Sequence, residues 1–178
     1  EKLMKIVQDC QIDVHDFWSA YFYLHFYTVN ADKLSENVWK EAEKMLEQIQ
    51  KYPQKEEYQK LVEADRIDLY EREAEKGDDR KFLEETDRVF KENLKGDPAW
   101  KLYERKLVYL ESKQPDISRE FERFLKKYPK VMDAYVEYSI YLCRNNKMTQ
   151  AQRIYREGRK QTGMTSKRAE ELRRKLGL

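Results

Sequence analysis

The sequence is poor in glycine, proline and cysteine. Its 178 residues include five Gly, four Pro and two Cys. Proteins built from sheets need many turns, and turns usually require more Gly and Pro, so a β-fold is disfavoured. Cys10 and Cys143 are too few for a disulfide framework and have no metal-ligand spacing. They indicate free thiols in a reducing, intracellular compartment.

The sequence also lacks several features that mark membrane proteins and enzymes. No apolar run approaches the ~20 residues of a membrane span, and there is no signal peptide, so we expect no membrane partner. The chain begins at Glu1, which we interpret as a domain cut from a longer protein. His15 and His25 have no nucleophile motif or further metal ligands beside them, so we expect partly buried structural histidines. With no Gly-rich phosphate loop either, we expect no cofactor, no metal and no enzyme activity.

Charged and aromatic residues are abundant. Charged residues make up 39% of the chain, and most are good helix formers. The 23 aromatic residues argue against disorder. The charge is uneven: residues 1–100 hold 16 basic and 24 acidic side chains, whereas residues 101–178 hold 20 basic and 10 acidic. An acidic first part and a basic second part can meet different partners.

Apolar residues recur at helical spacing, for example at Trp100, Tyr103, Leu107 and Leu110, which predicts an all-α chain. Gly and Pro turn signals divide the chain into segments of ordinary helix length. Asp116 and Thr149 are the expected N-caps of two helices. First helices are expected to start near Asp16, Lys55, Pro98 and Asp133, second helices near Ser35, Asp79, Asp116 and Thr149, and a ninth helix at Ser166.

The sequence repeats itself. The aromatic pair Trp100 and Tyr103 recurs 35 residues later. An Arg followed two residues on by an aromatic recurs in the second helices, at Arg88, Arg119 and Arg153. A single helix pair cannot bury its apolar face alone, so stacked neighbours should bury these side chains. The predicted repeat core is Trp100, Tyr103, Phe121, Tyr135, Tyr138 and Tyr155.

We therefore predict one repeat domain over residues 1–178, with about four helix pairs and a C-terminal capping helix. The units are approximately 12–53, 54–96, 97–130 and 131–163, and the cap is 164–178.

These residues resemble the half-a-TPR (HAT) repeat family: an aromatic, a Tyr three residues on, then Arg-x-aromatic and a Pro. The last unit is also similar to the tetratricopeptide repeat. Leu107 and Leu142 stand where the HAT family has Glu, and only Asp65 is acidic at that position. The resemblance implies a right-handed superhelical array of antiparallel helix pairs, an α-solenoid. It also implies a nuclear scaffold in mRNA splicing, 3′-end cleavage or ribosomal RNA maturation.

The first predicted helix is aromatic on nearly every face. Such a helix is either buried between neighbours or exposes one side to a partner. The exposed alternative would give a docking surface for another protein or for a second copy, which would make a homodimer. The expected surface is Trp18, Tyr21, Phe22 and Phe26.

The C-terminal end is strongly basic. Residues 144–178 contain 11 Lys or Arg and three Glu. This end is either a solvated face or a surface for RNA phosphates or an acidic protein. Arg153 is expected to pack its stem between helices instead. The candidate contacts are Arg156, Lys160, Arg168, Arg173, Arg174 and Lys175.

The leading hypothesis is a non-catalytic scaffold whose groove holds a partner helix or peptide in an RNA-processing complex. Direct RNA binding by the basic end stays open, although only Tyr155 lies among those charges for base stacking. A tetratricopeptide-type adaptor unrelated to RNA also stays open.

Overall fold

The chain is all-helical. The computed structural model describes residues 14–33, 38–53, 55–92 and 96–178, and within these ranges it contains nine α-helices, one short 3-10 helix and no strand. The prediction of an all-α chain is confirmed. The helices are α2 (Phe17–Asn30), α3 (Val38–Ile49), α4 (Glu56–Glu75), α5 (Arg80–Lys91), α6 (Gly96–Glu111), α7 (Ser118–Lys127), α8 (Met132–Arg144), α9 (Met148–Thr162) and α10 (Lys167–Lys175), with the 3-10 helix at Ala31–Lys33 after α2.

The predicted helix starts lie within three residues of the observed ones, but both predicted N-caps are wrong. Ile117, and not Asp116, is the N-cap residue of α7. Thr149 was expected to cap α9, yet it lies inside the helix and is exposed, and Lys147 is the N-cap residue. Asn146 adopts a left-handed conformation with φ of 58°. This turn brings the Lys147 amine to 2.6 Å from the Asp116 carboxylate. Asp116 in turn accepts a hydrogen bond from the Ser118 amide at 2.9 Å, at the start of α7.

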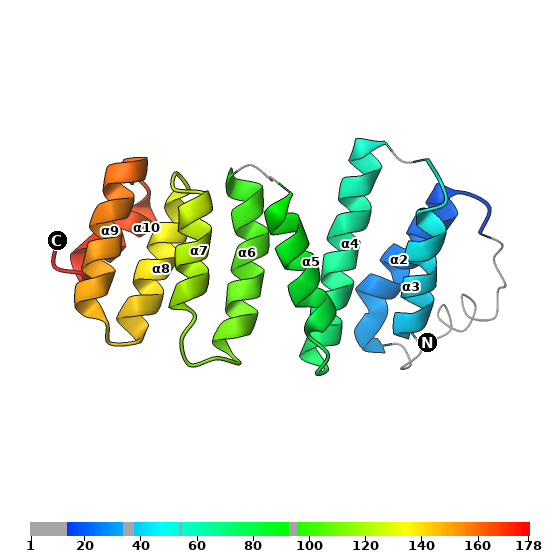
Figure 1. Cartoon of the computed structure of the whole chain (residues 1–178), viewed down its shortest axis with the longest axis horizontal. Coiled ribbons are helices and arrows are strands. Elements are labelled where there is room, and N and C mark those ends of the chain that lie inside the picture. The colour runs from blue at the N-terminus through cyan, green and yellow to red at the C-terminus, as the bar shows by residue number, and fades with distance from the viewer. Residues whose placement is uncertain (1–13, 34–37, 54, 93–95) are drawn as a thin grey trace. The chain divides into compact units, whose positions relative to one another are not determined.

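The chain divides into two compact units, residues 1–85 and 86–178, with the boundary inside α5. In the N-terminal unit, α2 packs against α3 and α4 (Figure 1). Burial of apolar side chains from all three helices stabilises this unit. Its core consists of Phe17, Ala20, Leu24, Ala42, Leu46, Ile49, Val62 and Leu69.

A buried carboxylate joins α2 to α4. Asp65 is buried, and its two oxygens lie 3.0 and 3.1 Å from His25 Nδ1. Tyr21 stacks on the His25 ring, with ring centroids 6.0 Å apart, and lies close enough to Asp65 to interact with its charge. The prediction of partly buried histidines is wrong. His15, which precedes α2, is exposed, and the His25 side chain is 55% exposed although it contacts a buried partner. A buried polar group needs such partners because leaving it unpaired costs free energy.

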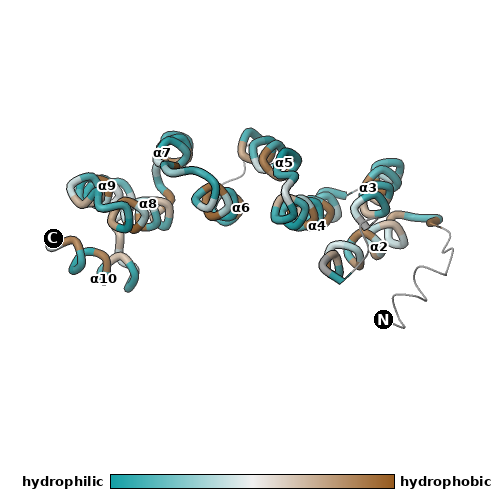
Figure 2. The backbone as a smooth tube through the Cα atoms, turned by 90° about the horizontal axis from the view of Figure 1, so that it is seen from below, coloured by the Kyte–Doolittle hydropathy of each residue, from teal (hydrophilic) through white to brown (hydrophobic). Residues whose placement is uncertain are grey.

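In the C-terminal unit, consecutive helices α6 to α9 lie side by side and run in alternating directions (Figure 1). The α8–α9 pair packs most extensively, and α7 also contacts both α6 and α8. The short helix α10 lies across α8 and α9 (Figure 2). Ser166 caps α10 by accepting a hydrogen bond from the Ala169 amide at 3.2 Å.

An equivalent contact occurs twice in this unit. Phe90 packs on Tyr103 with ring centroids 4.8 Å apart, and Phe121 stacks on Tyr138 with centroids 4.7 Å apart. In each case an aromatic residue of one helix meets the Tyr of a later helix, at matching positions of the sequence repeat. Tyr155, the third residue of this kind, donates a hydrogen bond to the Ala169 carbonyl of α10 at 3.1 Å. The six residues of the predicted repeat core are all buried.

A network of charged side chains joins α5, α6 and α7. The Lys106 side chain is 6% exposed, and its amine lies 2.7 Å from Asp87 of α5 and 3.1 Å from Glu120 of α7. Arg123 lies 3.1 Å from Asp87, and the Tyr103 hydroxyl donates to Glu120 at 2.6 Å. Two cations therefore meet two carboxylates, and the buried ammonium is fully paired.

Gly158 allows α9 to approach α8 closely. A Cβ at Gly158 would lie 2.6 Å from both Cβ and Cγ of Tyr135 and would also collide with the end of Met164. The Met164 side chain is flexible, but Tyr135 Cβ is fixed to the α8 backbone. A side chain at position 158 would therefore push the two helices apart.

We expect Gly158→Ala to lower the free energy of unfolding by about 2 kcal/mol, because overpacking outweighs the ~1 kcal/mol gain in helix propensity. Denaturant unfolding followed by circular dichroism measures this change. Arg156→Ala, at an exposed position two residues earlier in α9, is the matched control and should change stability by less than about 0.5 kcal/mol. A stabilised Gly158→Ala protein would show that the close approach is not required.

Candidate functional site

The first candidate surface is an apolar stripe on α2. Phe22, Val29 and Trp18 are 60%, 54% and 51% exposed. With the partly buried Phe26 they follow a spacing of four, four and three residues, which is one face of a helix. Trp18 also rests edge-on against Tyr58 of α4, with ring centroids 4.8 Å apart. We name Trp18, Phe22, Phe26 and Val29 the α2 stripe.

Tyr21, which the sequence grouped with these residues, lies elsewhere. It is partly buried and turned toward Asp65. Burial, followed by the charge of Asp65, raises the pKa of Tyr21 to about 12. Val29 takes its place in the exposed stripe, and the helical spacing from Trp18 could have identified it.

The predicted basic end separates into groups with different environments. Arg156 and Lys160 are exposed on α9. Arg173 is partly buried, lies 2.8 Å from Glu170 and donates to the Leu178 carbonyl at 2.7 Å, so it helps to hold the end of α10. Arg174 lies 3.7 Å from the same Glu170. Arg173 is therefore less accessible to a partner than the exposed Arg156 and Lys160.

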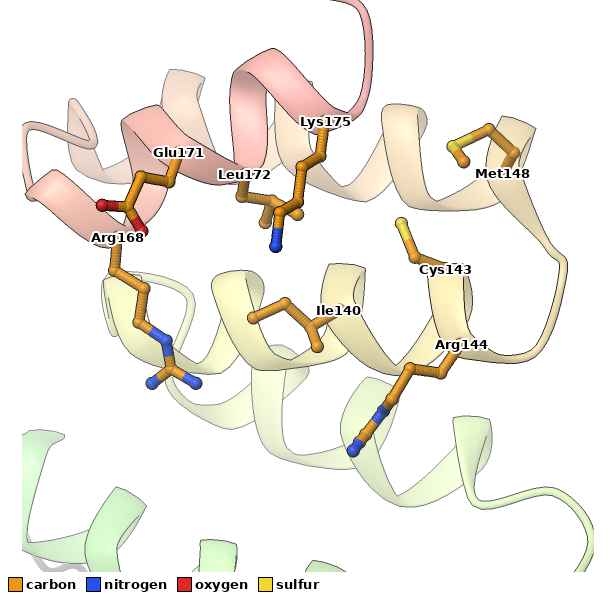
Figure 3. A pocket seen from close by; sticks show the side chains of 8 residues that line it. All are labelled: Ile140, Cys143, Arg144, Met148, Arg168, Glu171, Leu172 and Lys175. Carbon is orange, nitrogen blue, oxygen red and sulfur yellow. The ribbon is translucent and has the colours of Figure 1, made fainter.

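Arg168 and Lys175 line a groove between α8 and α10 that the sequence did not reveal (Figure 3). The groove has a volume of about 310 Å³. Its apolar lining comes from both helices and from the start of α9, and its charged lining comes from α8 and α10. The apolar residues are Ile140, Cys143, Met148 and Leu172, and the charged residues are Arg144, Arg168, Glu171 and Lys175.

The charges around the groove differ in how they are paired. Arg168 pairs with Glu137 of α8, and Arg144 lies 3.1 Å from Glu111 of α6. Within the described part of the chain, Lys175 is exposed and forms no ion pair. Figure 3 shows its side chain pointing from α10 toward α8. Burial raises the pKa of the Cys143 thiol, and the Lys175 charge opposes that rise.

A second groove, of about 390 Å³, lies between α7, α8 and α9. Arg153 lines it together with Glu157, Glu122 and Lys126, so its charges are balanced. Arg153 was expected to pack its stem between helices, but it is exposed. This balance gives the groove no preference for a partner of one sign.

Comparison with known proteins finds no matching family model, no matching curated protein and no matching solved structure. Across the described ranges, no group of three or more His, Cys, Asp or Glu side chains is placed to hold a metal ion. No helix in those ranges is both long and apolar enough to cross a membrane. Cys10 lies outside the described residues.

Proposed function

We propose that the protein is a non-catalytic helical-repeat scaffold of the HAT type that binds other proteins within an RNA-processing complex. The observation that carries the proposal is the recurring aromatic contact, Phe90 on Tyr103 and Phe121 on Tyr138. A repeat array stacks equivalent units through equivalent contacts, and such arrays commonly serve as binding surfaces. The RNA-processing role and a nuclear location come from the resemblance to HAT repeats alone.

The α2 stripe supports a protein-binding role. Large apolar side chains on one exposed helix face favour docking against another apolar surface, because association removes them from water. The partner is either a different protein or a second copy of the chain. Since Trp18 is already oriented by Tyr58, little side-chain entropy remains to be lost when it docks.

Affinity capture tests the proposal. The tagged full chain is used to recover proteins and RNA from a cell extract, with and without ribonuclease. We expect the same proteins in both samples, including components of an RNA-processing complex. A differently tagged second copy of the chain, added to the extract, reports self-association. Recovery of RNA alone, or loss of every protein after ribonuclease treatment, would contradict the proposal.

Paired variants show whether the α2 stripe is used. Trp18→Ser with Phe22→Ser should reduce capture several-fold, because two exposed aromatic anchors are lost. Val108→Ser is the matched control, since Val108 is 66% exposed and lies on α6. Equal recovery with both variants would place docking away from α2.

Direct RNA binding is a second candidate, favoured by the exposed Arg156 and Lys160 on α9. Contacts to several phosphates release counterions, so this binding should weaken steeply as salt rises, whereas apolar docking should not. Titration of single-stranded RNA at several salt concentrations separates the two functions.

A further inference from the structure

The groove between α8 and α10 combines an apolar floor, an unpaired lysine and a basic surrounding (Figure 3). We propose that it binds a protein segment in which aliphatic side chains are flanked by Asp or Glu. This inference rests on the proposed function, because it gives the chemistry of one partner of the scaffold.

The apolar floor supplies a place for an aliphatic side chain. Ile140 and Cys143 are three residues apart on α8 and are partly buried, and Leu172 faces them from α10. Met148, which is 46% exposed at the start of α9, closes one end. Met side chains adapt to irregular partners, and the volume of about 310 Å³ is that of a small binding pocket.

The charges in the groove favour a partner that carries negative charge. Arg168 and Arg144 are already paired with carboxylates, so Lys175 is the cation that a carboxylate can engage without displacing an existing partner. The segment that forms α9 and α10 is also basic overall, since residues 144–178 hold 11 Lys or Arg and three Glu. This excess favours the approach of an acidic segment and adds salt-sensitive affinity.

The composition of the groove favours a peptide over RNA. Nucleic acid that binds in a groove without base pairing usually stacks its bases on aromatic side chains. The lining contains no aromatic residue on which a base could stack. The aliphatic side chains and the unpaired Lys175 of the groove are complementary to a peptide in which an aliphatic residue lies beside a carboxylate.

The test uses the full chain carrying Cys10→Ser, so that Cys143 is its only thiol. The probe is a fluorescent peptide in which pairs of Leu are flanked by Asp and Glu. Two matched peptides replace either every Leu by Ser or every carboxylate by its amide. Fluorescence anisotropy gives the dissociation constant, and the rate of iodoacetamide labelling of Cys143 reports whether the groove is occupied.

We expect the probe to bind, both matched peptides to bind more weakly, and the bound probe to slow labelling of Cys143. Lys175→Glu should weaken binding about tenfold, because an attraction becomes a repulsion. Lys160→Glu makes the same change in charge at an exposed position of α9 outside the groove lining, and should weaken binding about twofold at most. Circular dichroism checks that both variants keep their helix content.

Several outcomes would overturn the inference. The probe peptide could fail to bind at near-physiological salt. Lys175→Glu and Lys160→Glu could weaken peptide binding equally, or the bound peptide could leave the rate of Cys143 labelling unchanged. If single-stranded RNA slows the labelling of Cys143 to the same extent as the peptide, the groove binds RNA instead. If the peptide fails while affinity capture still recovers partner proteins, only this inference falls and the proposed scaffold function remains.

Discussion

Replacement of Lys106 by Met should lower the free energy of unfolding by about 3 kcal/mol. The Lys106 ammonium is nearly enclosed and is shared between Asp87 and Glu120. Met keeps the length of the side chain and fills the same space, so the loss comes from two partly buried carboxylates deprived of a cation. Removing one member of a buried ion pair typically costs about 3–5 kcal/mol, and Arg123 compensates part of this by remaining near both carboxylates.

The same variant should show a weaker dependence of stability on acid. Burial alone would raise the pKa of Asp87 and Glu120, but in the native protein Lys106, Arg123 and the Tyr103 hydroxyl outweigh it and both pKa values are lowered. A lowered native pKa gives stability that is present above the ordinary carboxyl pKa and is lost as the pH falls through the native value. Without Lys106 both native pKa values rise toward the ordinary carboxyl value or above it, so these two groups should lose less stability between neutral and acid pH than they do in the unsubstituted protein.

Denaturant unfolding at neutral pH and through the acid range measures both effects. Lys101→Met, at an exposed position on the same helix, is the matched control and should change stability by less than about 0.5 kcal/mol. Adding Glu120→Gln to Lys106→Met should recover part of the loss, because one unpaired charge is removed. A loss below about 1 kcal/mol, with an unchanged acid transition, would mean that the network does not stabilise the fold.

The network around Lys106 could be predicted only in part from the sequence. Lys106 lies three residues after Tyr103 and beside Leu107, so helical spacing alone places it on the buried face of α6. The sequence therefore contained a sign that this lysine is unusual. Its partners come from α5 and α7, and no local pattern specifies which carboxylates those helices bring to it. Local spacing predicts burial, whereas pairing depends on how the helices pack.

The groove between α8 and α10 has the same limitation. Arg168, Leu172 and Lys175 are spaced to share one face of α10, which the sequence could indicate. Their position against α8 depends on the turn before α10. Gly163 has φ of 79° and Met164 has φ of 21°, both positive. The sequence identified Gly163 as a helix stop, but a stop signal does not fix the direction in which the next helix leaves. The groove was therefore not predicted, although the shared helix face of its α10 residues could be predicted from their spacing.

Trp100→Ala should be the most destabilising single change in the C-terminal unit. The Trp100 side chain is 4% exposed and packs edge-on against Phe124, with ring centroids 5.1 Å apart. It also lies near Phe121, with centroids 6.5 Å apart, so its removal empties a space between α6 and α7. Truncation of a buried Trp costs about 3–5 kcal/mol, because transfer free energy is lost and a cavity remains.

The change is measured by denaturant unfolding of the full chain, followed by circular dichroism because the substitution removes a fluorophore. Val108→Ala, at a position of α6 that is 66% exposed, is the control and should cost less than about 0.5 kcal/mol. Trp100→Phe should retain more of the stability than Trp100→Ala, since a smaller aromatic ring still contacts Phe124. Because the chain has two compact units, it can unfold in two steps. The loss of stability should then appear in the step in which residues 86–178 unfold. A loss below about 1 kcal/mol would show that the repeating aromatic spacing does not create the core between these helices.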